Sequence, residues 1–151
     1  MLAWLVGTHG DIVPLVLRLT LAVVMFPHGA QKALGWFGGS GLRGTLDFLR
    51  KSGVPSPVAV LTIMAEFLGP LGLAVGLLTR VAALGIAAVM LGAILTVHRE
   101  RFFMNWYGNE QVEGFEYHVL AIGLAVALVL DGAGAWSLDA LIAGHLGTAL
   151  S

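Results

Sequence analysis

Seven acidic, basic or strongly polar side chains stand inside or at the ends of long apolar stretches of this sequence. They are His28, Gln31, Lys32, Glu66, His98, Glu116 and His118. A charged group in hydrocarbon costs roughly 2.5–3.5 kcal/mol on insertion scales, so a chain with several such groups is expected to make them face one another. A cavity, a cofactor site or a proton path would each use this set, because carboxylates and imidazoles accept and donate protons.

The composition places these side chains in a membrane. Of the 151 residues, 58% are hydrophobic and 11% are charged, and the mean hydropathy is +0.89. Soluble domains carry about 25% charged residues, so this chain has too few charges to cover a water-facing surface. Lipid is therefore its expected solvent.

Charge and cysteine content exclude several classes of function. The formal net charge is −1 and no basic run is present, which argues against nucleic-acid binding. The sequence contains no cysteine, so disulfides, thiolate metal ligands, iron–sulfur clusters and covalent c-type haem are excluded. Any redox chemistry would use a bound cofactor or a diffusible one.

The apolar runs predict the elements that hold these residues. Four runs, at about 12–34, 57–78, 81–98 and 116–131, have the length and composition of membrane-spanning helices. Between the first two, leucines recur at helical spacing opposite charged residues, which predicts a short interfacial helix over about 41–52. The predicted fold is all-α: a single four-helix antiparallel transmembrane bundle over 1–151, with this interfacial helix in the first loop.

Depth along the predicted helices brings the polar residues into one half of the bilayer. At 1.5 Å per residue, His28 lies roughly 9 Å and Glu66 roughly 14 Å from the side of the long loops. Arg18 enters from the opposite side and approaches the depth of Glu66, so an Arg18–Glu66 ion pair is expected. Lys32 is expected to extend its ammonium group to the interface. The residues at helix ends on the long-loop side are His98, Glu116 and His118.

The distribution of basic residues predicts an orientation. Those on the side of the first and third loops are Lys32, Arg43, Arg50, Lys51, Arg99 and Arg101. The other side has Arg80, and Arg18 lies inside the first helix. The positive-inside rule then places both long loops in the cytoplasm and both termini outside.

Several structural roles compete with a functional site. Glu66 could form a structural ion pair or a hydrogen bond to His28, and aromatic residues such as Trp106 are typical interface anchors. His28, His98 and His118 are candidate metal ligands, with Glu66 or Glu116 completing the set, because neutral imidazole suits Zn, Cu or Fe. The sequence has no HxxxH or HExxH spacing among them, so no metal site is predicted.

Short motifs spread over nearly the whole chain resemble the DoxX family of small bacterial membrane proteins. In the first half they are Arg18-Leu19, His28-Gly29-Ala30-Gln31-Lys32, Gly35-Trp36-Phe37-Gly38-Gly39, Glu66-Phe67-Leu68-Gly69 and Gly76-Leu77-Leu78-Thr79-Arg80. In the second half they are Phe102-Phe103-Met104-Asn105-Trp106, Glu113-Gly114-Phe115-Glu116-Tyr117, and Gly132-Ala133-Gly134 with Ser137-Leu138-Asp139. One departure is Gly69-Pro70, where many relatives have two glycines.

The resemblance implies a four-helix protein of the bacterial cytoplasmic membrane. It also suggests a function, because family members are associated with quinol oxidase, thiosulfate:quinone oxidoreduction and oxidative-stress complexes. The leading hypothesis is a quinone-interacting subunit of a respiratory or redox-protective system that depends on a redox-protein partner for electrons. Whether it acts as an oxidoreductase on its own, and whether it forms homo-oligomers, stays open.

In this hypothesis Glu66, His28 and His118 do the proton chemistry. The residues expected to bind the quinone head group are His28, Gln31, Glu66, Trp106, Glu116 and His118. The alternatives are a non-catalytic membrane scaffold, in which buried charges hold the helices in register, and a metal-handling or transport protein that uses the His/Glu cluster.

Overall fold

The computed structural model describes residues 2–108, 113–145 and 147. Over these residues the chain is helical and contains no strand. The elements in order are α1 (Leu2–Val6), α2 (Val13–Leu34), η1 (Trp36–Gly38), α3 (Gly41–Lys51), α4 (Ser56–Val75), α5 (Thr79–Ala93), η2 (Ile94–His98), α6 (Glu116–Asp131) and α7 (Leu138–His145). Helices therefore form over all four predicted apolar runs and over the predicted helix in the first loop.

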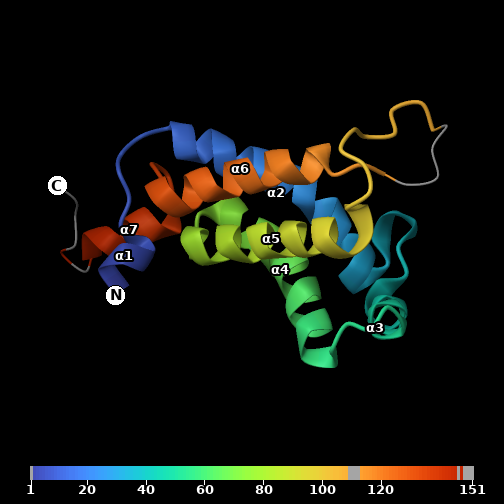
Figure 1. Ribbon diagram of the computed structural model, residues 1–151. Helices are drawn as coiled ribbons and strands as arrows, with labels where there is room; N and C mark the ends of the chain where they lie inside the picture. Colours follow the sequence, from blue (N-terminus) through green and yellow to red (C-terminus); the bar gives the residue numbers. More distant parts are fainter. Residues whose placement is uncertain (1, 109–112, 146, 148–151) are drawn as a thin grey trace.

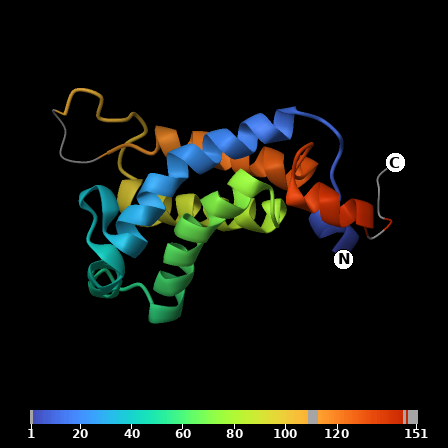
Figure 2. The same cartoon turned by 180° about the vertical axis from the view of Figure 1, so that it is seen from behind.

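The four longest helices share one apolar core. α2 packs against α4, α4 against α5, and α5 against α6, and α2, α5 and α6 lie roughly lengthwise beside one another (Figures 1 and 2). The first half of α4 diverges from this bundle toward α3 in both views. The largest buried apolar side chains of the core cluster are Leu21, Met25, Leu73, Ile86 and Leu128.

Within the described part of the chain, three helices are long and apolar enough to cross a membrane. They are Val13–Leu34, Ser56–Val75 and the continuous segment Thr79–His98, which joins α5 to η2. α6 coincides with the fourth predicted run but has only 16 residues. Length and composition thus support three of the four predicted spans.

The boundary of α4 differs from the prediction because of a glycine. The apolar run continues to about residue 78, but α4 ends at Val75 and Gly76 adopts a left-handed conformation with φ of 68°. A side chain at this position would collide with Ser137 and with the Arg18 guanidinium. Gly76 therefore ends the helix and also lets the C-terminal segment approach it closely.

The first and last helices, α1 and α7, lie at one end of the molecule, whereas α3 lies at the other (Figures 1 and 2). The terminal end is held by side chains that satisfy helix ends. Asp139 is 1% exposed, and its carboxylate accepts hydrogen bonds from the first backbone N–H groups of the α5 turn, Leu78 at 2.8 Å and Thr79 at 2.9 Å. These N–H groups have no partner within the helix itself.

Two buried arginines complete this end. Arg18 Nη1 donates to the carbonyl of Leu73 at 3.0 Å and Nη2 to that of Trp136 at 3.0 Å. Arg80 donates to the carbonyls of Val129 and Trp4, at 2.9 Å and 2.7 Å. Each guanidinium thereby binds carbonyls at helix ends and ties the terminal segments to the bundle.

The expected Arg18–Glu66 ion pair is therefore wrong. Arg18 reaches Leu73, which lies seven residues after Glu66 and so about 10 Å further along α4. The free carbonyls that can accept from a guanidinium are concentrated at the end of the helix, and the long arginine side chain extends toward them.

Candidate functional site

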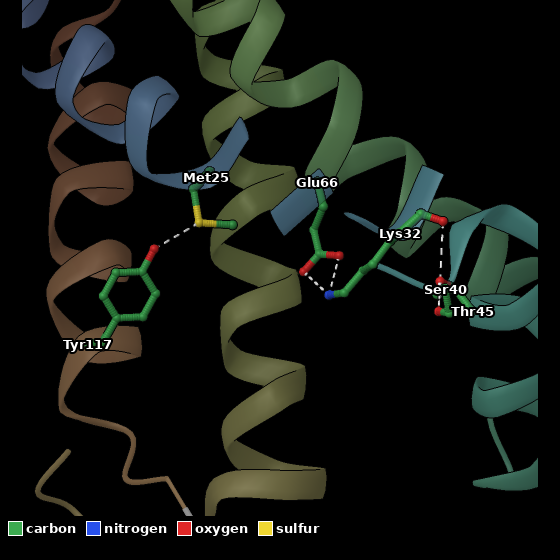
Figure 3. A network of polar contacts seen from close by, with 6 residues as sticks. All are labelled: Met25, Lys32, Ser40, Thr45, Glu66 and Tyr117. Atoms are coloured by element: carbon green, nitrogen blue, oxygen red, sulfur yellow. Dashed lines mark hydrogen bonds and ion pairs between the residues drawn. The ribbon is translucent and has the colours of Figure 1, made fainter. Parts of the chain in front are cut away.

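Glu66 and Lys32 form an ion pair between α4 and α2 (Figure 3). Lys32 Nζ donates to both carboxylate oxygens, with Oε1 at 2.5 Å. The Glu66 side chain is 3% exposed and that of Lys32 38%. The expectation that Lys32 extends to the interface is wrong: its ammonium group binds Glu66 instead. A lysine that extended to the interface would leave the buried Glu66 carboxylate without a counter-charge.

A glycine brings the two helices close enough for this pair. A Cβ atom added to Gly29 would overlap the backbone carbonyl of Glu66 and lie 2.7 Å from Phe67 Cα. Only glycine allows α2 and α4 to approach to backbone contact here. Lys32 is three residues after Gly29 and therefore on the same face of α2, which directs it toward Glu66.

A cavity of about 260 Å³ lies beside the ion pair. Residues with charged, imidazole or phenol side chains come from four helical elements and one loop: His28 and Lys32 from α2, Glu66 from α4, His98 from η2, Tyr117 and His118 from α6, and Glu113 from the loop before α6. Methionines of α2 and α5 line it as well, Met25 and Met90, and a loop residue, Met104. The structure thus brings His28, Glu66, His98 and His118 together, as expected from their depth.

Two imidazoles pack against each other in this cavity. The ring centroids of His98 and His118 are 4.5 Å apart. His98 Nδ1 is 3.0 Å from the backbone carbonyl oxygen of Glu113. His118 Nδ1 is buried and has no hydrogen-bond partner among the described residues. The ring of Tyr117 lies 6.2 Å from that of His28, and its hydroxyl donates to Met25 Sδ at 3.2 Å (Figure 3).

The loop between η2 and α6 contributes one side of the cavity through Met104, Glu113 and Gly114. Its two ends pair with each other: Phe115 N donates to the Arg101 carbonyl at 3.1 Å, and Glu116 N to the Phe102 carbonyl at 2.8 Å. Gly114 is needed at this crossing, because an added Cβ would overlap the carbonyl groups of residues 102 and 103. The ends of the loop are therefore held against the helices that carry the imidazoles.

The structure places three other predicted binding residues away from the cavity lining. Gln31 Nε2 donates to the Phe37 carbonyl at 3.2 Å. Trp106 is 78% exposed. Glu116 Oε2 accepts from Met104 N at 3.3 Å and so helps to hold the loop. Within the described part of the chain, no three residues of the His, Asp and Glu types are arranged to hold a metal ion.

Sequence reasoning missed the roles of Lys32 and Tyr117. Lys32 follows Gly29 by three residues, and a glycine that precedes a lysine on one helix face could have indicated a close helix approach. Tyr117 stands between two candidate residues in the sequence, but an ordinary aromatic residue at a helix start gives no sign of facing a cavity. For Tyr117 the packing of α6 against α2 and α5 is needed.

The long apolar helices define an integral membrane protein, and the cavity gathers several of its ionisable side chains. Comparison with known proteins gives the family: the DoxX family model matches residues 13–99. The chain belongs to the DoxX family.

Two curated relatives are informative. One is the putative oxidoreductase CatD of Bacillus subtilis (strain 168), 31% identical over 118 residues that cover 78% of this chain and 79% of the relative. The other is the inner membrane protein YqjF of Escherichia coli (strain K12), 29% identical over 133 residues that cover 87% of this chain and 93% of the relative. No solved structure matches the chain significantly.

Proposed function

We propose that this DoxX-family protein binds the head group of a quinone in the cavity beside Lys32 and Glu66, as the membrane subunit of a respiratory or redox-protective system. The observation that carries the proposal is the convergence of a carboxylate, an ammonium group and imidazoles on one cavity beside the apolar core of the bundle. Intramembrane ionisable groups are rare and mark functional sites by default. The name of the relative CatD, a putative oxidoreductase, agrees with redox chemistry.

The lining residues suit such a ligand. A quinone ring has two carbonyl oxygens that accept hydrogen bonds, and its reduction to the quinol takes up two electrons and two protons. Lys32 Nζ is the fixed donor beside the cavity, and the unpartnered His118 Nδ1 can bind or protonate a ligand oxygen. The thioether groups of Met25 and Met90 offer apolar, polarisable contacts to a flat ring. The cavity of about 260 Å³ lies just below the usual range for ligand pockets, roughly 300–1,000 Å³, so the proposal assigns to it the head group alone.

The proposal includes an arrangement in the bilayer. We place α6 in the membrane as a fourth spanning helix, because it packs along α5 and its exposed face carries Val119, Leu120 and Leu130. α3 lies in the interface, with Leu42 and Phe48 exposed to lipid. Because the basic residues are concentrated on the side of the long loops, we propose that both loops face the cytoplasm, and the likeness to an inner membrane protein agrees with the bacterial cytoplasmic membrane.

Analysis of bound lipid-soluble molecules tests the proposal. The chain is purified in lipid nanodiscs, extracted with organic solvent, and its quinone content is compared with its phospholipid content. We expect about one quinone per chain in excess of the lipid background, and loss of this excess in Glu66→Gln. Asp47→Asn is the matched control, since it makes the same acid-to-amide change at an exposed site on α3. An excess that is absent from the wild type, or unchanged in Glu66→Gln, would contradict the proposal.

A scaffold role is the second candidate, and the ion pair itself favours it. Lys32 and Glu66 join α2 to α4 and could fix helix register without any ligand. Two results together would support this alternative: the wild type contains no bound quinone, and a folded Glu66→Gln variant recruits the same membrane partners as the wild type.

A further inference from the structure

The rings of His98 and His118 lie against each other, and the binding of a ligand does not require this contact between two imidazoles. His98 belongs to η2, a π-helical turn that replaces the regular end of α5. π-helical turns are rare and frequently occur at functional sites. Here the turn ends at His98, whose ring lies 4.5 Å from that of His118.

The hydrogen bond of His98 fixes its protonation. The partner of Nδ1 is a backbone carbonyl oxygen, that of Glu113, and a carbonyl can only accept. Nδ1 must therefore carry a proton, and in the neutral ring Nε2 is left with a free lone pair. A ring in this tautomer can take up a second proton at Nε2 while it keeps its anchor on the loop.

The two rings stand between the loop and the buried acid. His98 is anchored to the exposed residue Glu113, whereas His118 has its Nδ1 buried and unpartnered among the described residues. The charged residues that line the cavity with this pair are Lys32 of α2, Glu66 of α4 and Glu113 of the loop, and His28 and Tyr117 line it as well. Lys32 and Glu66 are hydrogen-bonded to each other. We therefore do not assign to either of them the transfer of protons from the loop to the cavity.

We infer that His98 and His118 form a proton relay between the loop surface and the cavity. His98 takes a proton from water at Nε2 and gives a proton from the same nitrogen to Nε2 of His118, and His118 gives its Nδ1 proton to an oxygen of the bound ligand. His118 is then left with its proton on Nε2, and exchange of this proton through water returns it to Nδ1 before the next passage. Each passage removes one proton from water and delivers one to the ligand, so two passages balance the two electrons that a redox-protein partner supplies. The inference rests on the proposed quinone site and adds to it a role for His98 in proton delivery through His118, whose ring lies 4.5 Å from its own.

Voltammetry of the protein in a lipid film on an electrode tests the relay, with decylubiquinone as the probe and the electrode as the electron donor. We expect His98→Gln to slow proton-coupled reduction by about 10²-fold, the lower end of the range for a positioned acid–base group. The rate is expressed per bound quinone, which separates a change in binding from a change in proton delivery, and glutamine keeps an N–H donor for the loop. Added imidazole should restore the rate in His98→Ala. His145→Gln, at an exposed histidine of α7, is the control.

The outcomes separate the two proposals. No signal from bound quinone in the wild type refutes the quinone site, and the relay with it. A wild-type signal with an unchanged rate in His98→Gln refutes the relay alone. Nitrogen-15 NMR of the histidine side chains gives a readout that needs no quinone: we expect neutral His98 to carry its proton on Nδ1, and a proton on Nε2 instead would overturn the relay.

Discussion

Removal of Lys32 should destabilise the protein more than removal of the acid that it binds. In Lys32→Met the Glu66 carboxylate stays in place with 3% of its side chain exposed and has no counter-charge. In Glu66→Gln the Lys32 ammonium stays, but its side chain is 38% exposed, so water can solvate it. The two partners therefore differ in what their loss leaves behind, although they form the same interaction.

The expected magnitudes follow from this difference in exposure. Loss of one partner from a buried ion pair costs about 3–5 kcal/mol, and partial exposure of Lys32 argues for the lower end, about 3 kcal/mol. For Glu66→Gln we expect about 1 kcal/mol, because the remaining charge is hydrated and glutamine can still accept a hydrogen bond. At about 2–4 °C per kcal/mol for a chain of this size, Lys32→Met should lower Tm by about 6–12 °C.

Thermal unfolding in one fixed detergent measures these differences. The double variant Lys32→Met/Glu66→Gln should be more stable than Lys32→Met alone by about 1–2 kcal/mol, because no charge is then left buried. The control is the exposed pair Asp47 and Arg50, 3.9 Å apart, where Arg50→Met should change stability by less than about 0.5 kcal/mol. If Lys32→Met unfolds at the wild-type temperature, or if Glu66→Gln costs as much as Lys32→Met, the reasoning is refuted.

Two further substitutions test the packing in the same assay. Asp139→Ala removes the acceptor for Leu78 N and Thr79 N at the start of α5 and should cost about 1–2 kcal/mol; an unchanged Tm would show that the carboxylate is no cap. Gly29→Ala forces α2 away from the α4 backbone and should cost about 1–3 kcal/mol, whereas Gly123→Ala, where an added Cβ meets nothing within 4 Å, should be close to neutral. Equal effects of the two alanine substitutions would contradict the close approach at Gly29.

The positions of the helices could be predicted because each follows from a local signal. The run predicted over about 12–34 is Val13–Leu34, and the helix predicted over about 41–52 is Gly41–Lys51. Apolar length, proline near the helix start and charge periodicity are properties of neighbouring residues, so they are visible in the sequence. The π-helical turn at Ile94–His98 had no such signal, since residues with ordinary helix preferences form it.

The partners of the charged residues could be predicted only in part. Depth along the helices correctly brought His28, Glu66, His98 and His118 to one region. It failed for Arg18, because depth does not say which face of a helix a side chain occupies or which backbone carbonyls are free nearby. The expectation for Lys32 failed because the long lysine side chain can reach both the interface and the buried carboxylate.

The amino-acid sequence by itself determined the solvent of this protein, its helices and the types of chemical group that it buries, because these depend on composition and on patterns a few residues long. The tertiary structure decided which groups meet. Gly29 lets α2 and α4 touch, so that Lys32 binds Glu66, and the crossing of the loop ends sets His98 beside His118. Such pairings depend on the rotation and separation of helices distant in the sequence, and these are fixed only when the whole bundle packs.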